Sequence, residues 1–128
     1  MEDALLDHVS IGVRDIAKSR AFYDAVFAAL GGSALHAGDD YAGYGRDVAA
    51  FWVQVAERPV PPDMGSGLHF CFDAASRAQV GAFHAAALAH GGADNGAPGL
   101  RPNYGPDYYA AFAIDPDGYR IEAHTHAA

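Results

Sequence analysis

The sequence predicts an α+β domain that contains two copies of one unit, each reading as a strand, a helix and then several strands. The first observation is an internal repeat. Fourteen residues separate His8 from Phe22, and fourteen separate His69 from Phe83, so the copies are offset by about 61 residues. The second is that apolar and polar residues alternate ahead of a helical pattern in each copy. We therefore expect one domain, 1–128, with an internal repeat over 5–57 and 66–125.

Composition restricts the classes of protein to consider. A chain of 128 residues suits one domain, and 51% hydrophobic with 19% charged residues is typical of a globular protein. The net charge of −8 argues against nucleic acid or an anionic membrane as a partner. Cys71 is the single cysteine, which excludes an internal disulfide and favours a reducing compartment. With no signal-peptide pattern and no apolar run of about 18 residues, we expect a soluble cytoplasmic protein.

The first copy opens with a strand and a helix. Residues 6–13 alternate between polar and apolar side chains, with His8 on the polar face. Asp15 is a suitable N-cap for a helix over 16–30, and a Gly-Gly pair ends that helix. Three strands are predicted to follow, at 33–36, 40–45 and 48–55.

A stretch rich in proline and glycine, 59–67, separates the copies. In the second copy residues 68–72 alternate, with His69 on the polar face. Ser76 and Gln79 have the spacing of a capping box, which predicts a helix to about residue 90. The remaining elements are expected to be a Gly/Pro-rich loop over 93–107, strands over 108–114 and 119–124, and an Asp-Pro-Asp-Gly turn over 115–118.

Three potential metal ligands lie on the polar faces of these strands. A helix must cover the apolar face of each sheet, so His8 and His69 both point to the opposite face. Period two in the last strand puts Glu122 on one face with Arg120 and His124. Two imidazoles and one carboxylate on the inner face of a curved sheet form a facial triad with open positions, which suits a divalent transition metal. The alternative is a degenerate site that binds no metal.

Several motifs together resemble the vicinal oxygen chelate superfamily, which includes glyoxalase I, extradiol dioxygenases, fosfomycin-resistance thiol transferases and bleomycin-resistance binding proteins. The motifs are Asp7-His8-Val9, Arg20-Ala21-Phe22-Tyr23, Gly67-Leu68-His69-Phe70 and Asp115-Pro116-Asp117-Gly118-Tyr119-Arg120-Ile121-Glu122, and the resemblance runs from Leu6 to about His124. Within the superfamily the chain most resembles small glyoxalase-like proteins that share Phe51-Trp52 and residues 95–102.

This resemblance implies two tandem βαβββ modules that form a cupped mixed β-sheet, with the helices on the convex side, and usually a homodimer. It implies metal ligands at His8, His69 and Glu122 for a divalent transition metal, which is Zn, Ni, Mn or Fe. Glyoxalase I carries a further carboxylate on the last strand of its first module, where this chain has Trp52 or Gln54. Neither side chain is a base. Trp52 would form a wall for the substrate and Gln54 could offer a neutral oxygen, so the three-ligand thiol transferases and dioxygenases match better than the isomerase.

The long loop of the second copy supplies further candidates for substrate binding, because such loops often cover a site. They are Arg101, Tyr104, Tyr108 and Tyr109. Cys71 has no adjacent base and is expected to pack as a small residue. The predicted function is a metal-dependent enzyme of lyase, isomerase, thiol transferase or dioxygenase type, acting on a small substrate with vicinal oxygens. The alternative is a non-catalytic drug- or metabolite-binding protein of the bleomycin-resistance type; no residue is assigned as the catalytic base.

Overall fold

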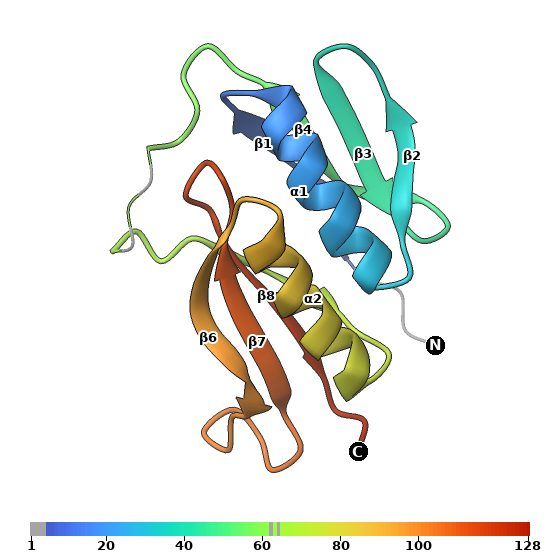
Figure 1. Ribbon diagram of the computed structural model, residues 1–128, viewed down its shortest axis with the longest axis vertical. Helices are drawn as coiled ribbons and strands as arrows, with labels where there is room; N and C mark the ends of the chain where they lie inside the picture. The colour runs from blue at the N-terminus through green and yellow to red at the C-terminus, as the bar shows by residue number, and fades with distance from the viewer. Residues whose placement is uncertain (1–4, 62, 64) are drawn as a thin grey trace.

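The computed structural model describes residues 5–61, 63 and 65–128, and over these residues the chain forms two βαβββ modules (Figure 1). Module 1 contains β1 (Val9–Val13), α1 (Ile16–Ala29), β2 (Ser33–Ala37), β3 (Tyr41–Gly45) and β4 (Ala49–Val55). Module 2 contains β5 (His69–Asp73), α2 (Arg77–Ala89), β6 (Ala93–Leu100), β7 (Tyr109–Ile114) and β8 (Arg120–Thr125). The predicted α+β class and the duplicated order of elements are confirmed.

Each module builds its own mixed sheet, and the two sheets have the same order. Module 1 has the strand order β1-β4-β3-β2 and module 2 has β5-β8-β7-β6. In each module the first strand pairs in parallel with the last, and the other pairings are antiparallel. Among the described residues, β1 and β5 are therefore edge strands, each paired on one side only.

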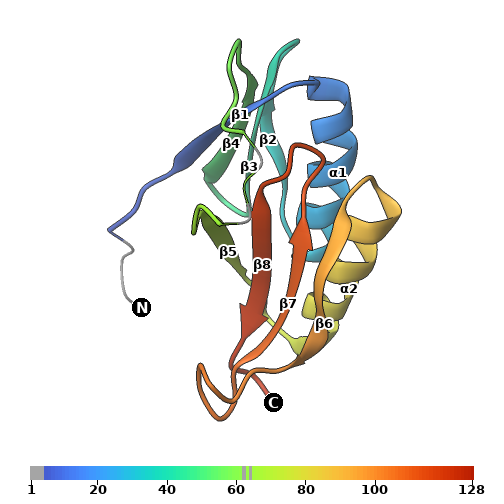
Figure 2. The same cartoon turned by 90° about the vertical axis from the view of Figure 1, so that its left-hand side faces the viewer.

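Both helices begin at the predicted caps and lie on the same side of the sheets (Figure 2). The Asp15 carboxylate accepts from the backbone N–H of Lys18 at 3.1 Å, and the Ser76 hydroxyl accepts from the N–H of Gln79 at 3.1 Å. The Gln79 side chain in turn accepts from the N–H of Ala75 at 2.8 Å, one residue before the position that a capping box predicts. None of the described helices is long and apolar enough to cross a membrane.

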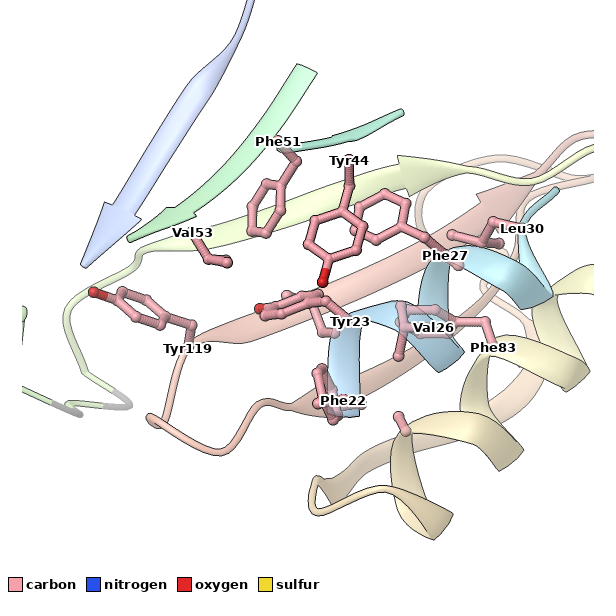
Figure 3. Close-up of a cluster of buried hydrophobic side chains, with 14 of the residues drawn as sticks. Phe22, Tyr23, Val26, Phe27, Leu30, Tyr44, Phe51, Val53, Phe83 and Tyr119 are labelled. Atoms are coloured by element: carbon pink, nitrogen blue, oxygen red, sulfur yellow. The ribbon is translucent and has the colours of Figure 1, made fainter. Parts of the chain in front are cut away.

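A single aromatic core joins the two modules (Figure 3). Phe22 of α1 and Phe83 of α2, the repeat equivalents, are both fully buried where the helices pack together. Phe72 of β5 contacts Phe27 of α1 and Phe51 of β4, with ring centroids 5.0 and 5.1 Å apart. The apolar faces of both sheets therefore contribute to one core, and the polar residues that alternate with them lie on the opposite face, which we call the outer face.

The β7–β8 turn of module 2 is anchored to module 1. The buried Asp115 carboxylate accepts from the hydroxyl of Tyr23 at 2.5 Å and from the backbone N–H of Tyr119 at 2.9 Å. The Asp117 carboxylate accepts from the Arg14 guanidinium at 3.1 Å, and the Tyr119 hydroxyl donates to the carbonyl of Gly12 at 2.8 Å. The turn that the Asp-Gly pair predicts is confirmed, and it also ties the two modules together.

The structure corrects the prediction of a loop over 93–107, because β6 occupies Ala93–Leu100. β6 is an edge strand that pairs only with β7. Pro98 has no backbone N–H to donate, and this is tolerated at a sheet edge because no second strand lies beside it to accept the hydrogen bond. Its register with β7 shifts beside Gly96 and again before Gly99, as expected where glycines allow a bulge. The loop is therefore confined to the residues between Leu100 and Tyr109.

Candidate functional site

The outer face of module 2 brings together two of the three predicted metal ligands. In the parallel pairing of β5 and β8, Cys71 lies opposite Glu122 and His69 lies opposite Arg120, so all four side chains share this face. The Nε2 atom of His69 is 3.0 Å from Oε1 of Glu122. The Glu122 side chain is 4% exposed and the His69 side chain is 48% exposed. An imidazole open to solvent thus meets a buried carboxylate.

Tyr108 holds the other oxygen of this carboxylate. Its hydroxyl donates to Oε2 of Glu122 at 2.6 Å, a short distance typical of a hydrogen bond to a charged acceptor. Desolvation, together with the nearby Glu122 carboxylate, raises the pKa of Tyr108 well above its usual value. The hydroxyl therefore keeps its proton at physiological pH and acts as a donor. Both oxygens of Glu122 are engaged by named side chains.

Two histidines pack around the Tyr108 ring. The imidazole of His124 stacks on it, with ring centroids 4.8 Å apart and an angle of 22° between the planes. His126 meets it edge-on, with centroids 5.4 Å apart. Each histidine has a carboxylate partner: Asp73 is 2.8 Å from Nε2 of His124, and Asp107 is 2.9 Å from Nδ1 of His126. The alternation of β5 already placed Asp73 on the face of His69, which is the sequence signal that could have identified this pairing.

His8, the third predicted ligand, lies apart from this pair. It immediately precedes β1, its side chain is half exposed, and its Nδ1 atom is 2.8 Å from a carboxylate oxygen of Asp7. Within the described part of one chain, no group of three or more His, Cys, Asp or Glu side chains is arranged to hold a metal ion. The His69–Glu122 pair fits a transition metal in donor type, since imidazole and carboxylate are common ligands, and His8 of the same chain does not join it.

Cys71 lies between these groups without the properties of a nucleophile. Desolvation and the neighbouring Glu122 carboxylate raise the pKa of its thiol to about 12. Its Sγ atom is 3.9 Å from the hydroxyl of Tyr108. Because the thiolate is the reactive form, a thiol that remains protonated at neutral pH is a weak nucleophile. This agrees with the expectation that Cys71 is not a nucleophile, although the residue is exposed at the cavity and is not packed in the core.

The outer face of module 1 carries aromatic rings at the equivalent place. In the β1–β4 register Trp52 lies opposite Ser10, the repeat equivalent of Cys71, so Trp52 rather than Gln54 corresponds to Glu122. Its indole lies over Gly43 of β3, where an added Cβ would come within 2.7 Å of the ring. The ring of His36 is nearly parallel to it at 15°, with centroids 5.5 Å apart, and Tyr41 is tilted beside it at 6.4 Å.

The other predicted substrate-binding residues are dispersed. The Arg101 guanidinium lies 5.3 Å from the ring centre of Phe112 and donates to the carbonyl of Ala97 on β6 at 2.7 Å. Tyr104 is exposed and contacts Tyr108 edge-on at 5.3 Å. Tyr109 instead packs against the core with Arg77 over its ring, and Gln54 is exposed on β4. The structure therefore brings Tyr108 to Glu122 and Tyr104 to Tyr108. Within the described part of the chain, the side chains of Arg101, Tyr109 and Gln54 form no hydrogen bond with Glu122.

A cavity of about 700 Å³ runs along edge strand β5 and reaches module 1. Its walls include His69, Cys71 and Asp73 from the outer face of β5, and Leu6 and Val48 from module 1. Leu6 is 70% exposed and Val48 is 78% exposed. A largely apolar opening beside an unpaired strand edge is thus continuous with the His69–Glu122 pair.

Comparison with known proteins agrees with this architecture. Residues 5–123 match the family described as the Glyoxalase/Bleomycin resistance protein/Dioxygenase superfamily. The chain belongs to this superfamily. It is similar to a glyoxalase/bleomycin resistance protein from Albidiferax ferrireducens T118, with 33% identity, a TM-score of 0.84, and coverage of 94% of this chain and 98% of the other. No curated protein matches the chain.

Two more distant structures show the superfamily fold alone. The fosfomycin resistance protein FosX from Listeria monocytogenes has 16% identity and a TM-score of 0.68, covering 97% of this chain and 93% of its own. A V278E mutant of glyoxalase I from Zea mays has 23% identity and a TM-score of 0.69, covering 93% of this chain and 45% of its own.

Proposed function

We propose that this superfamily member is a metal-dependent enzyme that acts on a small substrate with vicinal oxygens. It works as a homodimer in which His69 and Glu122 of one subunit are joined by His8 of the partner subunit. The observation that carries the proposal is the 3.0 Å approach of His69 Nε2 to the buried Glu122 carboxylate. Its single cysteine suits the reducing cytoplasm as the place of action.

A bound cation would satisfy the electrostatics of this pair. A buried carboxylate is costly unless a positive partner or a set of hydrogen bonds compensates its charge. Glu122 has only the Tyr108 hydroxyl and the His69 imidazole as side-chain partners among the described residues. A divalent ion such as Zn, Ni, Mn or Fe would supply the charge and accept both donors.

A second copy of the chain would complete the ligand set. His8 immediately precedes β1 and His69 begins β5, and each of these strands is at one edge of its sheet. The exposed Leu6 and Val48 and the cavity along β5 offer apolar surface for the partner. In a two-fold dimer each contact occurs twice, so a partner β1 placed at this β5 generates two identical sites.

Bound between these residues, the metal would act as a Lewis acid that stabilises negative charge on two neighbouring substrate oxygens. Glu122 and His69 would hold it, and Tyr108 would keep Glu122 fixed. Trp52 offers a flat wall for the substrate and no carboxylate to move a proton. Among lyase, isomerase, thiol transferase and dioxygenase chemistry, this lack of a base favours the thiol transferase and dioxygenase types.

The second candidate is a non-catalytic binder of a drug or metabolite. The aromatic surface of Trp52, His36 and Tyr41 favours it, because stacked rings bind flat ligands without any metal. Metal content separates the two functions. Protein purified without a tag and with about one divalent ion per chain supports the enzyme, whereas protein that neither retains nor takes up such an ion supports the binder.

The decisive variant is Glu122→Gln, which keeps the shape of the side chain and removes its charge. The unfolding midpoint of the wild type is expected to rise when Mn(II), Ni(II) or Zn(II) is added, because the ion binds the folded state. That rise should be largely lost in Glu122→Gln. The exposed Glu57, in the segment after β4, provides the matched control Glu57→Gln, which should respond as the wild type does. Equal metal shifts in all three proteins would remove Glu122 from the site.

Mixed dimers test the sharing of the site. A His8→Ala chain and a Glu122→Gln chain, co-expressed and isolated as a mixed dimer, retain one complete site if His8 comes from the partner subunit. We expect that dimer to bind half the wild-type amount of metal, while each variant alone binds little. A mixed dimer that binds no metal would contradict the shared site.

A further inference from the structure

We propose that Tyr108 is a positioning residue that fixes the Glu122 carboxylate, so that Oε1 faces His69 and Oε2 is withheld from the metal. This inference rests on the proposed function for its role in metal binding. It assigns Tyr108 to act through Glu122 rather than by touching the substrate.

The hydrogen bonds around Glu122 determine the orientation of its carboxylate. The two oxygens of its carboxylate have different partners, the Tyr108 hydroxyl at 2.6 Å on Oε2 and His69 Nε2 at 3.0 Å on Oε1. A hydroxyl that donates to a carboxylate at this distance makes a strong, directional bond. It sets the rotation of the carboxylate about its terminal torsion, which is otherwise broad. Oε1 is therefore the oxygen that points toward His69 on the outer face.

The packing of two imidazoles against the Tyr108 ring determines the position of that ring. His124 lies against one face of the ring at 4.8 Å and His126 meets it edge-on at 5.4 Å. Asp73 and Asp107 hold these two imidazoles at 2.8 and 2.9 Å. The holding groups come from β5, the loop before β7, β8 and the segment after it, so several separate parts of module 2 determine where the ring lies.

A ring held in this way directs its hydroxyl to a defined point. Removing the hydroxyl alone, as in Tyr108→Phe, leaves the stacking with His124 and His126 in place. Without this donor, the buried Oε2 of Glu122 would lose its partner and the carboxylate would turn toward His69 or a cation. The variant thus separates the positioning of Glu122 from the packing of module 2.

The test compares Tyr108→Phe with the wild type and with Tyr104→Phe as the control. The Tyr104 hydroxyl is exposed and, among the described residues, forms no hydrogen bond, unlike the hydroxyl of Tyr108. Each protein is titrated with Co(II), and the dissociation constant and the visible absorption spectrum are measured. Groups that orient a ligand typically contribute about 10- to 100-fold to metal affinity. We expect Tyr108→Phe to bind Co(II) that much more weakly, because the carboxylate is no longer held in position before the ion binds, and with an altered spectrum, because either carboxylate oxygen can then reach the ion. Tyr104→Phe should match the wild type in both.

A crystal structure of metal-free Tyr108→Phe gives a readout that does not depend on metal binding. The Glu122 carboxylate is expected to turn from the orientation it has in the wild type. If it keeps that orientation, or if the Co(II) affinity and spectrum are unchanged, Tyr108 is not a positioning residue. If the wild type binds no Co(II), the proposed metal function fails, and the orientation of Glu122 in the metal-free crystal alone decides whether Tyr108 positions it. Unfolding midpoints check that the variants remain folded.

Discussion

The two modules share one topology and equivalent strand registers, yet their outer faces differ in chemistry. Ser10 and Trp52 face each other in module 1 where Cys71 and Glu122 face each other in module 2. The neighbouring strand accounts for the difference in the space available to the side chain. Gly43 is opposite Trp52 and, having no side chain, lets the indole lie over it, whereas Phe112 is opposite Glu122. A duplicated backbone therefore determines where a side chain points, and the adjacent strand determines how large and how polar it can be.

The turns that precede β4 and β8, the last strands of the two modules, differ in how deeply they are buried. The β7–β8 turn of module 2 is anchored to module 1 through the buried Asp115. The β3–β4 turn of module 1 leaves Val48 exposed at the cavity and reaches module 2 through Arg46, which donates to the carbonyl of Asp73 at 2.6 Å. One turn is sealed into the core and the other remains at the surface, beside the site. This asymmetry leaves free surface on the side where a partner is proposed to bind.

The largest expected effect on this comparison comes from Gly43→Ala. A Cβ at this position would lie 2.7 Å from the Trp52 indole, so the ring must move or the strands must separate. Overpacking of this kind costs up to about 3 kcal/mol of unfolding free energy. Because Trp52 is the only tryptophan, its fluorescence emission should shift in parallel.

The control for this change is Gly81→Ala in helix α2, where an added Cβ meets nothing within 4 Å. Replacing a helical glycine with alanine should stabilise the protein by about 0.5–1 kcal/mol and leave the emission unchanged. Urea unfolding and emission spectra measure both variants. Unaltered emission in Gly43→Ala would mean that the indole does not rest on this glycine.

A smaller and pH-dependent effect is expected at Asp115. Burial raises the pKa of its carboxyl from 3.8 to about 6, so between these values the folded state binds more protons than the unfolded state. The contribution of Asp115 to stability is therefore most favourable below this window, and it falls as the pH rises to about 6. A shift of this size corresponds to a change on the order of 3 kcal/mol in unfolding free energy.

The measurement is the difference in unfolding free energy between the wild type and Asp115→Asn across this window. A difference is needed because Asp94 and Asp107 have pKa values lowered by hydrogen bonds, and their contributions are lost as the pH falls. The wild type should lose stability relative to the variant as the pH rises. A difference that stays constant with pH would show that Asp115 titrates normally.

The smallest expected effect is a null result that follows from Trp52. Wild-type protein supplied with Ni(II) or Zn(II) should isomerise the methylglyoxal–glutathione hemithioacetal negligibly, because module 1 provides no carboxylate at the place equivalent to Glu122. The measurement is the absorbance of the thioester product over time, with a glyoxalase I of known activity as the positive control. Robust turnover by this chain would mean that the reaction does not need an acid on β4.

The alternating patterns predicted the main strands and the side chains they present. His69 and Glu122 share a face as expected, because period two is a local property of β5 and β8. β6 was missed because its proline and two glycines are tolerated at an edge, and edges are defined by tertiary pairing. Composition within a segment does not carry that information.

The residues that surround Glu122 could not be predicted from local sequence patterns either. Its burial depends on Tyr108, which reaches it from the loop before β7, and on the ring packing of His124. The choice between Trp52 and Gln54 as its equivalent needed the strand register, because both side chains lie on the same face and a shift of two residues exchanges them. Contacts between segments distant in the chain, such as Tyr23 with Asp115, likewise follow from the assembled fold.

The shared aromatic core has a consequence for how the molecule can be divided. Phe27 and Phe51 of module 1 pack directly on Phe72 of module 2. Cutting the chain between the repeats would leave large aromatic surfaces in water on both fragments, at a free-energy cost that neither fragment could meet alone. The repeat that is visible in the sequence therefore does not mark two folding units. Any oligomer must form from whole chains whose halves melt together.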